Sequence, residues 1–335
     1  MVSTAVSASR VTSPEAASAA AAPLCPATGL PAVRCIQAVS AEVHGFMYRV
    51  SFGVEVDRQL APAGRLRLWQ SPCGLAFFDP MIAGDETFYD DLYVRLGEEG
   101  PWQAARVERS DYARVAADIK PGETVLDVGC GPAGFARWVP HARYVGLERS
   151  VSAQKVAADV RQETIAEHAA AHPDEYDAVC SFHVIEHLAE PALFVADLIR
   201  CVRPGGRLFL AAPSWPGAMT DIPNFALNAP PHHLSWWTEE ALRTLAERFG
   251  LGVESVEILP ASTHLGLIYW MGRLAPKITG DRFFRHSWGW YGALVWSWLA
   301  GRVCNTLLGP PKVSNFGAPK VSNSFELLLV ARKPD

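Results

Sequence analysis

The stretch that decides the fold reads Val125-Leu126-Asp127-Val128-Gly129-Cys130-Gly131-Pro132-Ala133-Gly134-Phe135. A short apolar strand passes there into a glycine-rich turn, and a helix is expected to follow. Gly129, Gly131 and Gly134 satisfy the pattern G-x-G-x-x-G, in which glycines let the backbone turn tightly and approach a nucleotide closely. Because simple tight turns also match this pattern, the neighbouring residues have to decide what the turn holds.

Two carboxylates flank this turn. Glu148 ends the next expected strand, 21 residues after Asp127, where a carboxylate can accept hydrogen bonds from both ribose hydroxyls of a nucleotide. Asp127 points into the turn where a pyrophosphate would lie, and like charges ~5 Å apart repel by about 3 kcal/mol at an effective dielectric near 20. The ammonium and sulfonium of S-adenosylmethionine would instead be attracted, so the sequence favours that cofactor over NAD.

Short apolar runs alternate with longer helical stretches from Gly122 onward, which predicts βαβ units in a mostly parallel sheet. The turn Arg203-Pro204-Gly205-Gly206 is expected to precede the fifth strand, since proline fixes φ and glycine permits a positive φ. Thr238 is expected to cap a helix that ends before Gly250. The seven expected strands cover residues 124–128, 144–148, 159–161, 176–182, 207–212, 253–259 and 324–331.

These stretches, in this order, resemble the class I S-adenosylmethionine-dependent methyltransferases. The matching segments are residues 125–131, 144–148, 176–188 and 198–213. The resemblance implies an α/β, Rossmann-like fold with a seven-stranded sheet, whose last strand runs antiparallel to its neighbour. It also implies that S-adenosylmethionine binds over the strand ends.

The same resemblance implies roles for the residues around the turn. Gly129 and Gly131 would contact the methionine part of the cofactor. Asp127 would hold the ammonium and Glu148 the ribose. Glu163 is a candidate near the adenine, although the segment around it departs from the family's short acidic pattern. The remaining expected cofactor contacts are Cys130, Ser181 and Phe182.

Titratable side chains follow the fourth expected strand, at the edge where open α/β sheets bind ligands. His183, Glu186 and His187 are spaced i, i+3 and i+4, so they share one face if a helical turn begins there. His232 and His233 follow in a loop expected over the same edge of the sheet. Both stretches resemble the small-molecule O-methyltransferases that include the quinone-biosynthesis enzymes.

A hydroxyl acceptor must lose its proton, and histidine is the natural general base at neutral pH. The sequence therefore predicts in-line methyl transfer to the hydroxyl oxygen of a small-molecule or lipid-linked acceptor. His187 or His232 is the expected base, followed by His183, with Glu186 beside them. A divalent metal held by Glu186, His187 and one of His232 or His233 is the less favoured alternative. An NAD-dependent oxidoreductase and a catalytically silent cofactor-binding module stay open as other classes.

Residues 23–100 are expected to form a small N-terminal unit that resembles a zinc ribbon with half of its ligands lost. Each of the two expected C-x-x-C pairs keeps one cysteine, Cys25 in the first and Cys73 in the second. Thr28 and Gln70 stand where the other two cysteines would be. Zinc binding is therefore not expected. A four-ligand site would need the irregular set Cys25, Cys73, Cys35 and His44.

The sequence also predicts the bounds of the other segments of the chain. Residues 1–22 are expected to be a disordered tail, 101–261 the methyltransferase core, and 324–335 the last core strand and the C-terminus. A tryptophan-rich insertion over 262–323 is expected to be a helical lid or dimer face, with contact to a membrane surface as the alternative. Its apolar stripe at helical spacing consists of Trp290, Tyr291, Leu294, Val295, Trp298 and Leu299.

The composition limits the partners. The chain has 335 residues, 49% of them hydrophobic, and a formal net charge of −5, so no overall cationic field favours a nucleic-acid partner. Seven scattered cysteines suit free thiols in a reducing compartment, and we expect a cytoplasmic protein. The longest charge-free apolar run, between Arg285 and Arg302, is shorter than the ~20 residues of a membrane-spanning helix.

Overall fold

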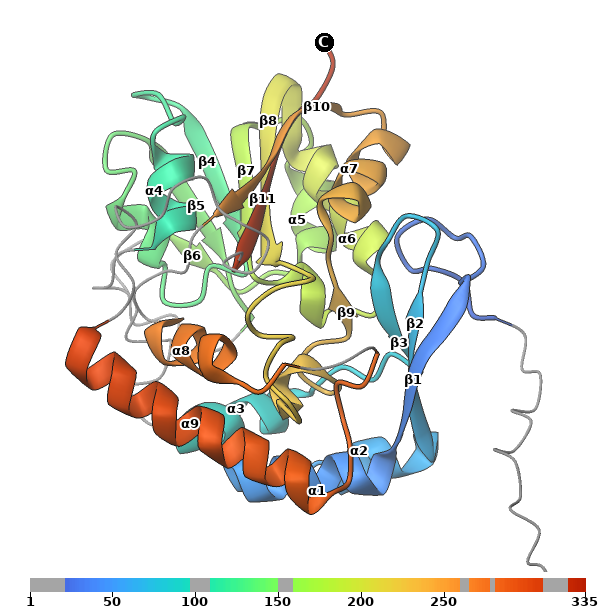
Figure 1. Ribbon diagram of the computed structural model, residues 1–335. Coiled ribbons are helices and arrows are strands. Elements are labelled where there is room, and N and C mark those ends of the chain that lie inside the picture. The colour runs from blue at the N-terminus through green and yellow to red at the C-terminus, as the bar shows by residue number, and fades with distance from the viewer. Residues whose placement is uncertain (1–21, 97–108, 150–158, 260–264, 278–280, 310–324) are drawn as a thin grey trace, which may run out of the picture.

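A seven-stranded sheet forms the centre of the molecule (Figure 1). The computed structural model describes residues 22–96, 109–149, 159–259, 265–277, 281–309 and 325–335. The strand order is β10-β11-β8-β7-β4-β5-β6. The strands are β4 (Thr124–Val128), β5 (Arg143–Leu147), β6 (Val160–Arg161), β7 (Tyr176–Phe182), β8 (Val202–Pro213), β10 (Gly252–Leu259) and β11 (Glu326–Arg332).

The directions of the strands confirm the predicted topology. β4 pairs in parallel with β5 and β7, β5 with β6, and β7 with β8. β11 pairs antiparallel with both β8 and β10. The carboxyl ends of β4, β5 and β7 therefore meet at one edge, as expected for a ligand-binding α/β sheet.

The fifth predicted strand begins earlier than the sequence suggested. Val202 already pairs with Tyr176, and pairing resumes where Arg207 meets Ala178. The Arg-Pro-Gly-Gly segment bulges between these two positions, with Gly205 at φ +66°. The predicted turn is therefore a bulge inside β8 and does not end the strand.

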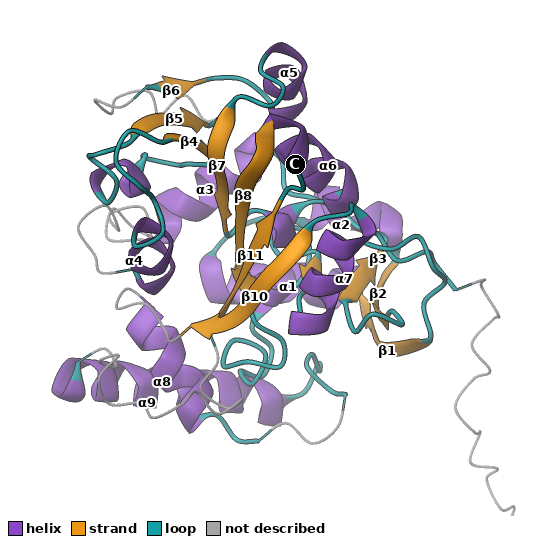
Figure 2. Ribbon diagram, turned by 90° about the horizontal axis from the view of Figure 1, so that it is seen from above, coloured by secondary structure: helices purple, strands orange, loops and turns teal. Residues whose placement is uncertain are grey.

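Apolar side chains cover both faces of the sheet. Along β11, successive side chains point to opposite faces. Leu327 and Leu329 join the core under the helices of one face, while Leu328 and Val330 join the core of the other. Figure 2 shows α5, α6 and α7 on one side of the sheet and α4 on the other. A strand buried on both faces reads as a nearly continuous hydrophobic run. These helices are α4 (Ser110–Ala116), α5 (Ile165–Ala171), α6 (Pro191–Cys201) and α7 (Glu239–Arg248), the last capped by Thr238.

A second sheet is shared between the N-terminal unit and the core. Its order is β1 (Arg34–Ser40), β2 (Arg65–Gln70), β3 (Ala76–Asp79) and β9 (Ser235–Trp236). β9 lies far downstream in the sequence, just after the His232-His233 pair. The N-terminal sheet therefore fixes the loop that carries these histidines. The helices of this unit are α1 (Ala41–Phe52), α2 (Asp57–Leu60) and α3 (Glu86–Leu96).

The two cysteines of the zinc-ribbon-like unit, Cys25 and Cys73, lie together. The buried thiols of Cys25 and Cys73 contact one another, and the Cys73 Sγ lies 3.0 Å from the Ser71 Oγ. Cys35 is exposed, whereas His44 is buried with its Nε2 2.8 Å from the Pro230 carbonyl oxygen. Within the described residues, the irregular four-ligand set is therefore not assembled.

Two helices, α8 (Gly266–Leu274) and α9 (Trp288–Leu308), fill the described part of the insertion between β10 and β11. The prediction that six residues form one packed stripe was wrong in part. Tyr291 and Leu294 pack against the core, but Val295 and Leu299 are 54% and 50% exposed. Residues 1–21 and 310–324 lie outside the described part of the chain. A search of the described helices found none with the length and apolar character needed to cross a bilayer.

Replacing Leu328 by alanine tests the packing of β11. Leu328 is fully buried in the sheet, so we expect the free energy of unfolding to fall by about 2–5 kcal/mol. Leu193 on α6 is 61% exposed, and Leu193→Ala is the matched control that leaves stability nearly unchanged. Urea denaturation followed by circular dichroism measures both; equal losses would contradict the described burial.

Candidate active site

The glycine turn lies directly against the segment that follows β7. Gly129 and Gly131 have φ values of +74° and +51°, which glycine adopts without strain. A Cβ on Gly129 would lie 2.4 Å from the Cγ2 atom of Val184. The close approach leaves no room for a side chain and places the turn beside His183 and its successors. The two sequence motifs therefore form one site.

Asp127 offers a buried acceptor at this turn. Its Oδ2 accepts a hydrogen bond from the Tyr144 hydroxyl at 2.8 Å. Its Oδ1 has no hydrogen-bond partner among the described residues, although the side chain is 1% exposed. Burial raises the pKa of Asp127 to about 7, and the Tyr144 hydrogen bond only partly opposes that rise. Since an unpaired buried polar atom is costly, this oxygen suits a ligand that brings a cationic donor.

Glu148 closes the other side of the turn. It follows β5, and its Oε2 accepts a hydrogen bond from the Gly131 backbone N–H at 3.0 Å. Asp127, Gly129, Gly131 and Glu148 therefore meet at the carboxyl ends of β4 and β5. A cationic cofactor that carries a ribose fits this donor and acceptor set.

Four other predicted cofactor residues are engaged in different contacts. The Cys130 side chain is buried, with its Sγ 3.6 Å from the Gly131 carbonyl oxygen. Ser181 Oγ donates to the Val128 carbonyl at 3.0 Å, and the buried Phe182 ring packs on Tyr112 and Phe135. Glu163 lies beyond β6, where its carboxylate is 2.8 Å from His168 Nδ1. The side chains of Cys130, Ser181 and Phe182 thus support the ends of β4 and β7.

His183 is surrounded by acids. It adopts φ +59°, which is uncommon for a residue other than glycine. Its ring nitrogens lie 3.5–3.6 Å from carboxylate oxygens of Asp111, Glu186 and Glu326. Burial opposes the charged imidazolium, but these carboxylates outweigh it and raise the pKa of His183 well above its ordinary value. This environment favours the protonated imidazole of His183, and its role as a third choice of general base stays a prediction.

No sequence pattern pointed to Arg109 and Asp111, which precede the first core strand. Arg109 Nε donates to Asp111 Oδ1 at 3.0 Å, and its guanidinium lies 3.8 Å above the Tyr112 ring. Burial disfavours the charge on Asp111, but Arg109 and His183 outweigh it and hold its pKa below the ordinary range. Glu326 begins β11, so only its position at a strand end could have placed it here.

Glu186 and His187 lie on the 3-10 turn Ile185–His187, directly after Val184. Glu186 is 1% exposed, and its Oε1 lies 3.7 Å from His187 Nε2. Its Oε2 has no hydrogen-bond partner among the residues described. The Leu234 backbone N–H donates to the Glu186 carbonyl at 2.7 Å and so fixes this turn to the His232-His233 loop. A second unpaired acceptor therefore lies on the turn that follows His183.

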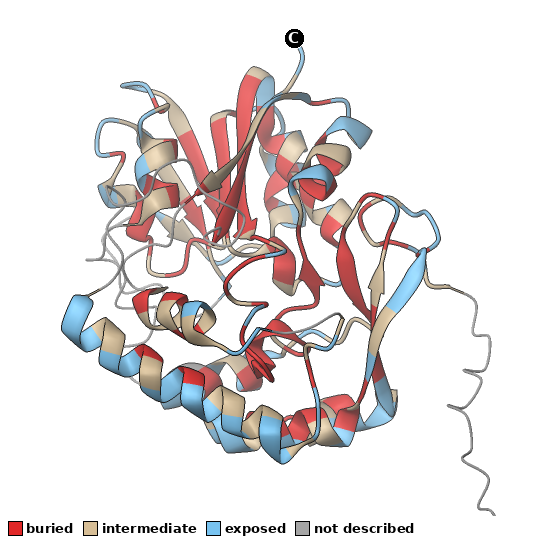
Figure 3. Ribbon diagram, in the orientation of Figure 1, coloured by how far each residue is buried: buried red, intermediate tan, exposed pale blue. Residues whose placement is uncertain are grey.

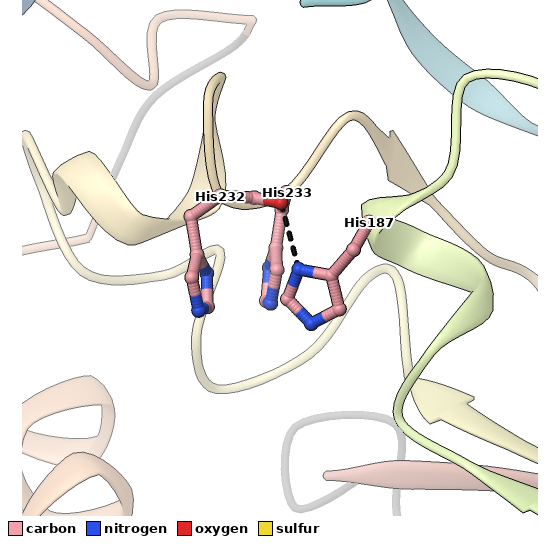
Figure 4. A group of neighbouring side chains, drawn as sticks. All are labelled: His187, His232 and His233. Atoms are coloured by element: carbon pink, nitrogen blue, oxygen red, sulfur yellow. Dashed lines mark hydrogen bonds between the residues drawn. The ribbon is translucent and has the colours of Figure 1, made fainter. Parts of the chain in front are cut away.

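His187, His232 and His233 converge beside this turn (Figure 4). His187 Nδ1 donates to the His232 carbonyl oxygen at 2.7 Å, which leaves the Nε2 lone pair available. Burial lowers the pKa of both His232 and His233 well below the ordinary value, so these two imidazoles stay neutral. One ligand atom from each of the three histidines lies within 4.8 Å of the others. Such a cluster can accept a proton or hold a divalent metal.

The central part of the chain is similar to known methyltransferases. A family model described as a methyltransferase domain matches residues 103–256. The ubiquinone biosynthesis O-methyltransferase of Klebsiella pneumoniae is 36% identical over 102 residues, which are 27% of this chain and 42% of that protein. The enzyme of the same name from Sodalis glossinidius is 33% identical over 127 residues, 34% of this chain and 51% of that protein. The chain thus spans about half the length of the curated relatives it matches.

A solved structure aligns over a larger share. The 1,6-didemethyltoxoflavin-N1-methyltransferase of Burkholderia thailandensis, with S-adenosylhomocysteine bound, is 16% identical, with a TM-score of 0.46. The alignment covers 78% of this chain and 95% of that one. The family match, the order of the seven-stranded sheet and the glycine turn agree on one assignment. The chain carries a class I S-adenosylmethionine-dependent methyltransferase domain.

Proposed function

We propose that this protein transfers a methyl group from S-adenosylmethionine to a hydroxyl oxygen of a small-molecule or lipid-linked acceptor. The observation that carries the proposal is the unpartnered Oδ1 of buried Asp127 at the glycine turn. This turn lies directly beside the segment that carries Glu186 and His187. The O-methyltransferase names of the relatives support oxygen as the methylated atom.

The chain's own residues divide the work of holding the cofactor. Asp127 would bind the ammonium group and Glu148 the ribose, while the backbone of Gly129 and Gly131 lets the methionine part approach closely. S-adenosylmethionine supplies a methyl group already activated by its cationic sulfur. The protein mainly has to align donor and acceptor, since a near-attack geometry provides much of the rate enhancement.

His187 is the proposed general base. Its Nε2 takes the proton of the acceptor hydroxyl, while its Nδ1 stays bonded to the His232 carbonyl and holds the ring in place. The Glu186 carboxylate, 3.7 Å from Nε2, stabilises the imidazolium that forms. The Tyr89 hydroxyl, 3.3 Å from Nδ1, supports the same ring position. A positioned base of this kind contributes about 10²–10⁴-fold to the rate.

A metal-assisted form of the same reaction is the second candidate. The ligand atoms of His187, His232 and His233 lie within 4.8 Å of one another, and His187 and His232 direct their Nδ1 atoms at backbone carbonyls. Backbone carbonyls commonly orient metal-ligating histidines in this way. A metal here would bind the acceptor oxygen and lower its pKa, and His187 would then be a ligand and not the base.

Replacing Asp127 by asparagine tests the cofactor site. Because the charge that faces the cationic ligand is removed with little change of shape, we expect S-adenosylmethionine to bind at least about tenfold more weakly. Isothermal titration calorimetry measures the affinity, and Asp197→Asn on α6 is the matched control. Tight binding of NAD by the native protein, with no response to S-adenosylmethionine, would overturn the assignment.

The affinity should also depend on pH through the same carboxyl. Below pH 7 the ammonium of the ligand stays charged while Asp127, with a pKa of about 7, is increasingly protonated. Binding should therefore tighten by roughly tenfold between pH 5.5 and pH 7 as the carboxylate forms. The Asp127→Asn variant should show a flat profile over this range, and a similar slope in both proteins would assign the effect to another group.

Replacing His187 by glutamine tests the acceptor side. We expect turnover to fall by about 10²–10⁴-fold while the affinity for S-adenosylmethionine stays unchanged. A mass-spectrometric screen of cell extract with labelled cofactor detects the methylated product and so identifies the acceptor. Turnover of that acceptor is then measured. His172→Gln, at the C-terminal end of α5, is the control. Cofactor binding without any methylated product would instead support a silent binding module.

Chelation separates the two candidate mechanisms. If His187 acts as a free base, dialysis against EDTA should leave turnover and the affinity for S-adenosylmethionine unchanged. If the three histidines hold a metal, chelation should abolish turnover, and zinc or another divalent metal should restore it. Metal analysis of the purified protein gives a reading that does not depend on turnover.

A further inference from the structure

Helix α9 exposes an apolar face that the protein does not cover. Of its 21 residues only Ser297 and Gly301 are buried. A Cβ on Gly301 would lie 2.9 Å from the Cγ atom of Met271, so α9 packs closely on α8 along a narrow line of small residues. The side of α9 opposite this line is left without cover by the described part of the chain. Figure 3 shows α9 along the outer edge of the molecule, largely exposed.

The exposed face of α9 is built from large apolar side chains at helical spacing. Trp288 is 92% exposed, Trp296 60% and Leu307 77%. A helix that faces water normally carries polar residues on that side, and a contiguous apolar patch marks an interaction surface. Arg302 is the one charged residue of the helix. The large apolar residues of the face are Trp288, Val295, Trp296, Leu299, Val303 and Leu307.

The segment that carries this face is cationic, although the chain as a whole has a net charge of −5. Among the described residues between 265 and 309, Asp281 is the one acid, and it is paired with Arg34. Five exposed basic residues lie in the same segment. They are Arg273, Lys277, Arg282, Arg285 and Arg302.

We propose that α9 docks this protein on the surface of an anionic lipid bilayer. Tryptophan and leucine enter the boundary between headgroups and acyl chains, while arginine and lysine bind the anionic headgroups. A second copy of the chain fits less well, because a symmetric contact through α9 would bring two sets of like charges together. The helix lies in the plane of the surface, since its Gly301 line stays packed on α8.

This docking goes beyond the proposed methyl transfer and does not depend on it. It would nevertheless orient the site. In Figure 1 the arrows of β7 and β8 point toward the layer that contains α8 and α9. A protein docked through α9 would therefore hold the carboxyl edge of its sheet on the membrane side, where an acceptor with a lipid tail is within reach.

Vesicle flotation of the full-length protein tests the proposal. We expect binding to vesicles of phosphatidylcholine with phosphatidylglycerol, weaker binding to phosphatidylcholine alone, and release by salt. Tryptophan emission should shift to shorter wavelength on binding. The double variant Trp296→Glu with Leu299→Glu should bind at least about tenfold more weakly. Leu30→Glu with Leu193→Glu, at positions 52% and 61% exposed elsewhere, is the matched control and should bind like the native protein.

Three results would overturn the docking. A native protein that stays with the aqueous phase would do so, and if sedimentation shows a dimer that the Trp296→Glu and Leu299→Glu pair dissociates, the face joins two copies of the chain. Equal loss of binding in the variant and its control would also do so. Calorimetric titration with S-adenosylmethionine accompanies each assay. It tells unfolding of a variant apart from loss of lipid binding, and failure of the methyltransferase proposal apart from failure of the docking proposal.

Discussion

The parallel pairing of β4 with β7 is the constraint on which the site depends. It places the end of each strand at the same edge, so that the glycine turn after Val128 and the turn after Phe182 come into contact. The Cβ that Gly129 lacks is the space that Val184 occupies. With any bulkier residue at that position, the cofactor turn and the histidine-bearing segment would move apart.

Charge balance around His183 joins the two halves of the site. Among the described residues, Arg109 and His183 are the basic groups of a region that also holds Asp111, Asp127, Glu186 and Glu326. The acids outnumber the cations, and one oxygen of Asp127 and one of Glu186 are left without hydrogen bonds in the described structure. Both observations favour a ligand that brings positive charge and hydrogen-bond donors.

Local sequence predicted the sheet well because strand runs, glycine turns and caps are signals between near neighbours. The same signals placed Asp127, Glu148, Glu186 and His187 at the carboxyl edge. Arg109 and Asp111 could not be predicted as site residues, since a short amphipathic helix before the first core strand has no distinctive spacing. The state of His183 also could not be predicted, because its pKa depends on carboxylates from α4, β11 and its own turn. Likewise, helical periodicity in α9 could not tell which apolar face packs on α8.

The antiparallel pairing of β3 with β9 ties the described N-terminal unit, from residue 22 onward, to the loop that carries His232 and His233. The N-terminal unit is therefore joined to this loop by strand pairing and is not a detachable appendage. Exchange of this unit between related chains would therefore change the surroundings of His232 and His233, while the glycine turn, built on β4 and β5, would be left intact.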